Sequence, residues 1–399
     1  MTTVPQLSPD ALGTPCGIAD PYPLYRALRD RSPVRYLRVP AGAMSGRSEP
    51  LYAHAVLRHA DVLAVVRSPA AFSSQTPALL QVVPRLALVH DDPPRHTQVR
   101  RLVNKAFTAQ RVAALAGSIG TLAEQLLEPL ASGVAEIMQA YAMQLPIRVI
   151  AALLGIPEQD YPAFRRWSEA TVGYTTLSAA ERAPRLAEMD SYLAQAITAR
   201  RTADQGDLIS ALATSEIDGT PLTDLELRRI VAVLLIAGNE TTIHLLGNML
   251  GLLAERPELW EQARADRSLV EPIIDEVLRF ESPVQRFSRV TTRPVEVGGV
   301  PIAAGELLDV FYGAANRDPA VFAEPDTFRL GRPAAEHLAW GAGIHFCLGS
   351  HLARLEAKLT LNAFLDRYSQ LARGPGSAER QASAQLSFGW RTLPLALHR

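Results

Sequence analysis

The stretch with the clearest chemistry is a glycine-punctuated loop that ends in a cysteine, Trp340-Gly341-Ala342-Gly343-Ile344-His345-Phe346-Cys347-Leu348-Gly349. An amphipathic run from Leu348 to Tyr368 follows and predicts a helix. The Cys347 sulfur is therefore expected at or just before a helix N-terminus, where backbone N–H groups and the helix dipole favour a thiolate. The two glycines would let the backbone pass close to something flat and bulky. Such a thiolate is a nucleophile, a redox centre or a metal ligand.

Other residues of the sequence reduce the number of possible roles for the Cys347 thiolate. His345 lies two residues from Cys347, but catalytic dyads are assembled in space, so this adjacency does not identify a nucleophile and its base. Zinc would need further Cys or His at ligand spacing, and none clusters here. A redox dithiol needs a second cysteine, and Cys16, in an irregular N-terminal arm, is expected to be incidental. What remains is one thiolate on one face of a metal cofactor, the arrangement of thiolate haem.

A haem carries two propionates, which need cationic or hydrogen-bonding partners. The candidates are His96, Arg100, Arg289 and His345. His96 and Arg100 stand one turn apart on a helix that Asp91-Asp92-Pro93-Pro94 is expected to start, with Asp as the cap. Without an anion nearby, the same pair would be an ordinary solvated basic face.

A second unusual stretch lies in the middle of the longest predicted helix. Thr223-Asp224-Leu225-Glu226 forms a capping box, and its helix extends to Arg256, ahead of Pro257. The apolar centre contains Ala237-Gly238-Asn239-Glu240-Thr241. Glycine inside a helix costs about 1 kcal/mol relative to alanine, and a buried carboxylate without a partner costs far more. Such residues tend to mark function. The alternative is that Gly238 permits close helix packing and Glu240 faces a water pocket.

Whole-chain properties set the class of protein. The chain has 399 residues, 48% hydrophobic, with a formal net charge of −1. This composition predicts a globular protein and gives no reason to expect nucleic-acid or membrane binding. Two cysteines far apart exclude a disulfide framework and favour a reducing cytoplasm. Met1 to Pro23 is rich in Pro and Gly and has no continuous apolar run, so we expect it to be neither a signal peptide nor a membrane anchor.

The elements that must position these residues are mostly helical. Apolar spacing predicts helices through residues 110–201, and strand patterns are confined to about 33–57, 286–311 and 385–397, the last as a closing hairpin. An apolar, irregular stretch from Ala70 to Asp92 is expected either to cover a binding site or to pack on the core. No linker, repeat or low-complexity tract divides the chain, so we expect a single domain over residues 1–399.

Together these features resemble the bacterial cytochrome P-450 family, over nearly the whole chain. The cysteine loop fits the family's haem signature of an aromatic residue, Gly-x-Gly, His and Cys-x-Gly, with Trp340 where phenylalanine is usual. Glu276 and Arg279 match its Glu-x-x-Arg pair, and Arg332 matches the arginine that joins this pair. Another familiar segment is Asn316-Arg317-Asp318-Pro319.

The resemblance implies the cytochrome P-450 fold, mainly α with a small β region. That fold is prism-like, with haem between the long central helix and the helix after the cysteine loop. Cys347 would ligate the iron of haem b, while Glu276, Arg279 and Arg332 would lock the cysteine loop. Arg329 stands where the family commonly has an aspartate, which leaves that aspartate's local contact in doubt. The other residues expected to contact haem are His96, Arg100, Arg289, His345, Gly341, Gly343, Phe346 and Gly349.

On the oxygen-binding side, the resemblance assigns O2 activation to the segment from Ala237 to Thr241. The missing side chain at Gly238 would make room for O2, Thr241 would hydrogen-bond the bound oxygen, and Glu240 would relay protons from solvent. The implied reaction is hydroxylation of a hydrophobic small molecule such as a terpenoid, steroid, fatty acid or polyketide. The residues expected to face this substrate are Leu79, Leu80, Val83, Leu86, Val233, Thr242, Val284, Phe287 and Phe388. For each of them taken singly, packing in the core is the simpler explanation.

The resemblance also implies partners. Electrons from NAD(P)H would arrive through a ferredoxin reductase and an acidic ferredoxin. The ferredoxin would dock on basic residues that are otherwise ordinary solvated charges, namely Arg101, Lys105, Arg111, Arg354 and Lys358. The expected protein is a cytoplasmic monomer. There are two alternatives to a monooxygenase. One is a non-catalytic haem sensor, which would not need the proton delivery that Glu240-Thr241 suggests. The other is a peroxide-driven or isomerising member of the family, in which this acid-alcohol pair is often replaced.

Overall fold

The computed structural model describes residues 9–13, 20–39, 48–80, 85–130, 132–172, 177–332, 337–381 and 386–399. These residues form two compact units, each drawn from separate stretches of the chain. Unit 1 comprises Met1–Val83, Asp275–Cys347 and Arg380–Gly389, and unit 2 comprises Pro84–Ile274, Leu348–Glu379 and Trp390–Arg399. The single domain expected from the sequence stays a prediction.

Unit 1 is built on a five-stranded sheet. Its strand order is β1 (Val34–Val39), β2 (Leu51–Val56), β10 (Leu307–Phe311), β7 (Arg286–Thr291) and β3 (Phe72–Ser73). β10 pairs in parallel with β2, and the other neighbours are antiparallel. In β10, Leu307 and Phe311 enter one core cluster, while Leu308 and Val310 enter another. Because both faces of β10 are covered, its sequence is continuously apolar except at Asp309.

Asp309 is a buried charge with a complete set of partners. Its carboxylate lies 2.8 Å from Nε of Arg38, and Arg286 lies 3.9 Å away. The hydroxyls of Tyr36 and Ser288 donate hydrogen bonds to it. Burial raises the pKa of this carboxyl, but the two guanidinium charges and the two hydrogen bonds outweigh burial and lower it. The sheet therefore encloses a charged aspartate on β10 that is held by partners on two other strands, β1 and β7.

Short helices and turns complete unit 1. Two of the helices are α1 (Tyr22–Arg29) and α2 (His59–Val66). The apolar stretch after Ala70 contains β3 and a one-turn helix, so it is less irregular than expected. The remaining elements are η1 (Pro9–Gly13), α3 (Pro77–Leu80), the hairpin of β8 (Val295–Val297) and β9 (Val300–Ile302), α14 (Tyr312–Ala315) and η6 (Gly343–His345). Helix α13 (Val270–Phe280) contributes its residues from Asp275 onward.

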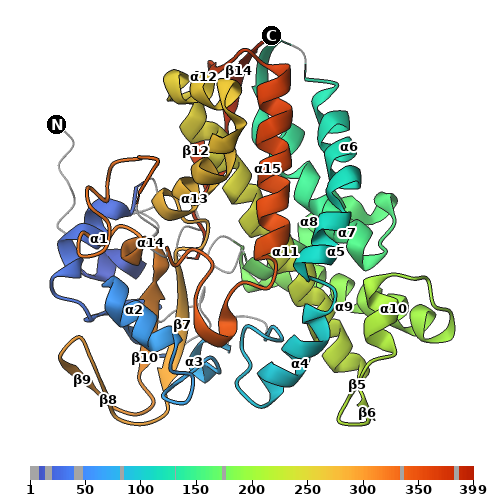
Figure 1. The fold of residues 1–399 in the computed structure, drawn as a ribbon. Helices are drawn as coiled ribbons and strands as arrows, with labels where there is room; N and C mark the ends of the chain where they lie inside the picture. The colour runs from blue at the N-terminus through green and yellow to red at the C-terminus, as the bar shows by residue number, and fades with distance from the viewer. Residues whose placement is uncertain are drawn as a thin grey trace. The chain divides into compact units, whose positions relative to one another are not determined.

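Unit 2 is helical around α11 (Asp224–Ala254). The predicted capping box is present, since Thr223 and Glu226 exchange side-chain and backbone hydrogen bonds. In Figure 1, α15 (Ser350–Arg367, red) stands beside α6 (Ala116–Leu127). The other helices are α4 (Arg95–Asn104), α5 (Ala109–Ala114), the π-helical η3 (Met138–Ala142), α7 (Gln144–Leu154), η4 (Glu158–Asp160), α8 (Tyr161–Val172), α9 (Ala179–Thr202), α10 (Leu208–Ala213), α12 (Pro257–Ala265) and η5 (Arg267–Leu269).

Helix α11 is a core helix. Among the described residues it alone is long and apolar enough to cross a membrane, but 78% of its most apolar window is buried inside the protein. Glycines allow close approach of its neighbours: a Cβ at Gly247 would lie 2.7 Å from Sδ of Met138 in η3. Substitution there would require the end of the Met138 side chain to shift. The apolar composition of α11 is therefore explained by packing.

The predicted C-terminal hairpin is wrong in its pairing. Strand β14 (Pro394–His398) pairs with β11 (Gln370–Arg373) and with β4 (Gly133–Glu136). The expected partner of β14 was the segment just before Gly389, of which residue 385 lies outside the described residues. Sequence proximity favours a hairpin, but two more distant segments supply the backbone partners of β14. The last strands are β5 (Glu216–Ile217), β6 (Thr220–Pro221), β12 (Glu379–Arg380) and β13 (Trp390–Thr392).

Candidate functional site

The cysteine loop is a tight turn in unit 1. The backbone N–H of Cys347 donates to the carbonyl of Trp340 over 2.8 Å, which closes the loop. Gly341 and Gly343 have φ angles of 69° and 68°, a left-handed conformation that favours glycine. A Cβ at Gly343 would lie 2.7 Å from the carbonyl oxygen of Val66, so Gly343 is required for packing on α2. The Cys347 side chain is partly exposed, and α15 begins three residues later at Ser350.

Arg289 is a buried cation close to this loop. The residue is 5% exposed, and within the described part of the chain its Nη1 donates a hydrogen bond to the carbonyl of Ser288, at 2.7 Å. Its charge lowers the pKa of Tyr312, although burial is larger and raises that pKa overall. The Tyr312 hydroxyl lies 3.9 Å from a Cβ built on Gly341. Within the described residues, no carboxylate forms an ion pair with Arg289. A buried guanidinium without a counter-charge costs several kcal/mol, so this position fits an anion supplied by a ligand.

His345 is the other predicted propionate partner in unit 1. Its Nε2 lies 2.9 Å from the Oγ of Ser74, which follows β3. The sequence analysis missed Ser74 and Tyr312, because both are distant from the loop along the chain. Ser74 precedes it by more than 200 residues and Tyr312 by about 30. The Cys347 thiol fits the iron of a haem, and His345 on the same loop and the buried Arg289 on β7 fit its propionates. Within the described part of the chain, no cluster of three or more His, Cys, Asp or Glu could hold a metal ion.

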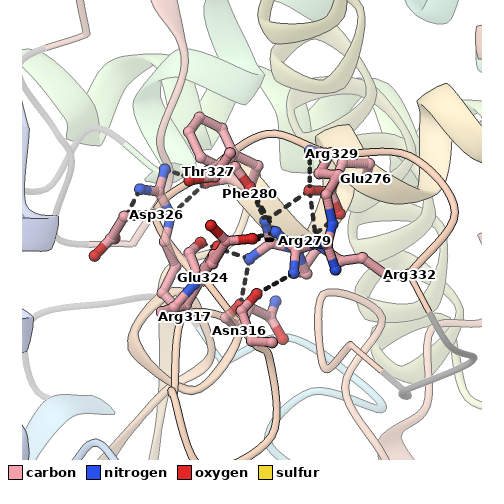
Figure 2. A network of polar contacts seen from close by, with 12 residues as sticks. Glu276, Arg279, Phe280, Asn316, Arg317, Glu324, Asp326, Thr327, Arg329 and Arg332 are labelled. Carbon is pink, nitrogen blue, oxygen red and sulfur yellow. Dashed lines mark hydrogen bonds and ion pairs between the residues drawn. The ribbon is translucent and has the colours of Figure 1, made fainter.

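Glu276, Arg279 and Arg332 meet in a buried network, shown in Figure 2. Nε and Nη2 of Arg279 donate to the two carboxylate oxygens of Glu276 at 2.8 and 2.7 Å. Nε of Arg332 donates to Glu276 at 3.1 Å. Burial alone would raise the pKa of Glu276, but these donors and the backbone N–H of Arg329 lower it. The carboxylate is therefore charged and fully used.

The same network fixes the coil that leads to the cysteine loop. Arg279 donates to the carbonyls of Asn316, Pro325 and Thr327, at 3.0, 2.8 and 3.2 Å. The side-chain oxygen of Asn316 accepts a hydrogen bond from the backbone N–H of Leu338 at 2.6 Å. Arg329, whose family counterpart is commonly an aspartate, contributes its backbone N–H to Glu276 over 2.9 Å. The network therefore holds residue 329 through its backbone, whatever its side chain.

The basic pair His96 and Arg100 lies on α4 in unit 2. His96 is 1% exposed, and Arg100 is half-buried, so this is not a solvated face. The predicted aspartate cap is wrong: the N-cap is Pro94, without a side-chain cap hydrogen bond. Asp91 instead accepts hydrogen bonds from the backbone N–H of Leu88 and from Arg85. The Asp91 carboxylate, which was predicted to cap the helix, therefore stabilises the turn before α4 instead.

The polar centre of α11 also lies in unit 2. The hydroxyl of Thr241 donates to the carbonyl of Ala237 at 2.9 Å, and that of Thr242 donates to Gly238 at 3.2 Å. These bonds leave the hydroxyl lone pairs able to accept. The Glu240 side chain is 14% exposed, and its Oε1 lies 3.6 Å from Nε2 of His244. Sequence reasoning missed His244, although its spacing of four residues from Glu240 was readable.

Gly238 faces another helix. A Cβ built on it would lie 3.2 Å from Cδ1 of Ile150 in α7. This distance is tighter than ordinary van der Waals contact. The geometry favours the close-packing interpretation of Gly238 over the interpretation that it makes room for O2.

The residues predicted to face a substrate are divided between the units. Leu79 and Phe388 belong to one core cluster of unit 1, and Val284 and Phe287 pack against the other. In unit 2, Val233 and Thr242 are buried in α11, and Leu86 is half-buried. Val83 and the side chain of Leu80 lie outside the described residues. Their role in binding stays a prediction.

Comparisons with known proteins agree on one family. The family model described as Cytochrome P-450 matches residues 174–397. The chain is 38% identical to the cytochrome P-450 monooxygenase PikC of Streptomyces venezuelae, over 89% of this chain and 85% of that protein. It is 36% identical to the erythromycin C-12 hydroxylase of Saccharopolyspora erythraea, over 85% and 88%.

A solved structure shows the same fold. The crystal structure of CYP109E1 from Bacillus megaterium with testosterone has a TM-score of 0.81 and 31% identity, covering 95% of this chain and all of that one (100%). The expected mainly α fold with a small β region is thereby confirmed. The chain belongs to the cytochrome P-450 family and is a monooxygenase of that family, which implies a thiolate-ligated haem and the use of O2.

Proposed function

We propose that this enzyme hydroxylates a bulky, mainly apolar small molecule, with Cys347 as the thiolate ligand of haem b. The observation that carries the haem assignment is the Arg289 guanidinium, 5% exposed and without a carboxylate partner among the described residues. Arg289 and His345 would hold propionates, and His96 and Arg100 would do the same from α4. When bound, the haem iron supplies the binding and activation of O2.

The chain's own residues then handle orientation and protons. Thr241 donates its hydroxyl hydrogen to the carbonyl of Ala237, so its oxygen is set to accept a hydrogen bond. Glu240, one residue earlier and 14% exposed, would exchange protons with solvent. Glu276, Arg279 and Arg332 would take no part in chemistry, because their polar atoms are occupied in holding the coil before the cysteine loop.

The substrate class follows from the relatives and from composition. The relatives' names include an erythromycin hydroxylase and a complex with testosterone, both large and mostly apolar molecules. The predicted facing residues of this chain are apolar apart from Thr242. We therefore place macrolide-type polyketides and steroids ahead of terpenoids and fatty acids.

The test of the haem assignment is the absorption spectrum of the reduced protein under carbon monoxide. Thiolate haem gives a red-shifted Soret band, which Cys347→Ala should abolish and Cys16→Ala should leave intact. Arg289→Gln should lower the haem content of the purified protein while leaving its unfolding midpoint in the haem-free form no lower. A wild-type protein without haem or without this band would overturn the assignment. Macrolide and steroid ligands can then be ranked by the spin-state shift they cause.

Electrons would come from a ferredoxin, with its reductase and NAD(P)H behind it. Arg101, Lys105 and Arg111 on α4, its C-cap and α5 are exposed and make no ion pair within the described residues. Lys358 and Arg354 on α15 instead share Glu271, at 2.9 and 4.0 Å. We therefore assign the acidic partner mainly to the first three residues. In addition, we propose that the protein is a cytoplasmic monomer.

Charge reversal distinguishes the two groups. Arg101→Glu should slow reduction by ferredoxin severalfold at low salt, whereas Lys358→Glu should have a smaller effect because Glu271 already offsets that charge. Reduction rates measured by stopped flow at low and high ionic strength provide the comparison. Equal effects of the two variants, or rates independent of salt, would contradict the assignment.

A further inference from the structure

A line of buried polar side chains runs along one face of α11. Glu240, His244 and Asn248 are each four residues apart, so they follow one another on the same face of the helix. Their exposure falls along the line: Glu240 is 14% exposed, His244 is 3% and Asn248 is fully buried. The residues around them, from Ile243 to Leu253, are otherwise almost entirely apolar. A buried imidazole in such surroundings needs a reason.

The position of His244 supplies that reason. Its Nε2 lies 3.6 Å from Oε1 of Glu240, a distance too short to hold a water molecule between them and slightly too long for a hydrogen bond. Within the described residues, neither ring nitrogen of His244 has a hydrogen-bond partner. A buried N–H left without an acceptor costs about 1–3 kcal/mol. A small rotation of either side chain would join Nε2–H to Oε1 and remove that cost.

We propose that His244 is a positioning residue for Glu240: its Nε2–H holds Oε1 of the carboxylate, so that proton exchange occurs through the other carboxylate oxygen. This inference rests on the proposed role of Glu240 in proton delivery. It adds a residue that the sequence motif does not include. Catalytic hydrogen bonds are often long in ligand-free structures and shorten during reaction, so a separation of 3.6 Å is the expected starting geometry.

The imidazole suits this task better than a plain apolar residue would. Glu240 is on the helix that carries Thr241, and its carboxylate can rotate about several side-chain bonds. A donor fixed one turn along the same helix selects one of these orientations. Displacing a catalytic group by 1 Å costs up to about 100-fold in rate, so a partial displacement should cost about tenfold.

Two variants separate positioning from packing. His244→Leu keeps an apolar side chain of comparable bulk but removes the donor. His244→Gln places an amide N–H near the position of Nε2. We expect His244→Leu to lower the product formed per NAD(P)H consumed about tenfold, with the missing electrons recovered as hydrogen peroxide. His244→Gln should stay within about twofold of the wild type. If both variants lose coupling equally, or neither does, the proposal is wrong.

A spectroscopic readout avoids turnover altogether. The ¹⁵N signals of the His244 ring, identified by their loss in His244→Gln, report which nitrogen carries the proton. In the diamagnetic ferrous carbon-monoxide form we expect Nε2 to be protonated, and Glu240→Ala to shift its signal. A His244 signal that ignores Glu240→Ala would overturn the proposal. Failure of the haem assignment would appear separately, as a missing thiolate Soret band in the wild type.

Discussion

Two buried glutamates on two helices show how partners decide the charge of a side chain. Glu276 on α13 is 5% exposed and Glu356 on α15 is 1% exposed, so the two are similarly removed from water. Glu276 receives donors from Arg279, Arg332 and the backbone of Arg329, which lower its pKa although burial raises it. Oε2 of Glu356 has no hydrogen-bond partner in the described part of the chain, and burial raises its pKa well above the ordinary value. The surroundings of Glu276 therefore favour its charged form, and those of Glu356 favour its neutral form.

The contrast bears on function. A carboxylate whose two oxygens are both held by donors, like that of Glu276, fixes chain geometry and cannot readily exchange a proton. A fully buried acid, like Glu356, has no water to exchange with. Glu240 differs from both, since its side chain is 14% exposed and the His244 imidazole lies 3.6 Å from its Oε1. Those conditions suit a group that passes protons between solvent and a reaction.

The largest effect should come from Glu276→Gln. This change leaves the guanidinium groups of Arg279 and Arg332 buried without their anion, which typically costs about 3–5 kcal/mol. We expect the midpoint of urea unfolding, followed by circular dichroism, to fall accordingly. The matched control is Glu324→Gln, which breaks the exposed ion pair with Arg329 and should cost less than about 1 kcal/mol. Equal losses in the two variants would show that the network is not a stabilising one.

Glu356→Gln should act in the opposite direction. Because the folded-state pKa of Glu356 is raised above that of the unfolded chain, its contribution to stability is fully present below the unfolded pKa, near 4.3, and is lost as pH rises. Glutamine removes this loss. The variant should match the wild type at pH 4 and gain on it by about 1.4 kcal/mol per pH unit above that, while the folded acid stays protonated.

Unfolding midpoints measured from pH 4 to pH 8 check this expectation. Infrared spectroscopy offers a second readout, since a protonated buried carboxyl absorbs apart from ionised ones and its band should vanish in Glu356→Gln. If Glu356→Gln lost stability at pH 7 as Glu276→Gln does, the two glutamates would not differ as the structure indicates.

Local patterns made several parts of the fold predictable from the sequence. The capping box at Thr223 and Glu226 and the strand Val34–Val39 depend on residues within a few positions of one another. Long-range partners were not predictable in this way. The pairing of β14 with β4 joins segments about 260 residues apart, and the partners of Asp309 come from β1 and β7. No local pattern states which distant strand will satisfy a backbone or a charge.

The residues of the candidate site also fall into two groups: those that the local sequence reveals, and those whose surroundings depend on distant segments. The cysteine loop and the segment around Glu240 were found because their residue types are unusual within their own elements. Arg289 could be proposed from its charge and from the family resemblance, but its burial and its lack of a carboxylate partner among the described residues were not predictable, because they depend on β7 and on the residues packed around it. Gly238 shows the limit most clearly, since both interpretations of it fit the sequence, and Ile150 on α7 distinguishes them.

The smallest effect, and the sharpest test of a single contact, is at Gly238. Alanine there would gain about 1 kcal/mol of helix propensity but crowd Cδ1 of Ile150, an overpacking that typically costs about 1–3 kcal/mol. We expect a net loss of about 1 kcal/mol in the wild-type background. In an Ile150→Ala background, where the crowded atoms are gone, the same change should be neutral or stabilising by about 1 kcal/mol. The measurement is the urea unfolding midpoint of the four proteins of this double-mutant cycle: wild type, Gly238→Ala, Ile150→Ala and the double variant. If Gly238 instead makes room for O2, the change will impair turnover in both backgrounds, even where stability is restored, and close packing will not account for the glycine.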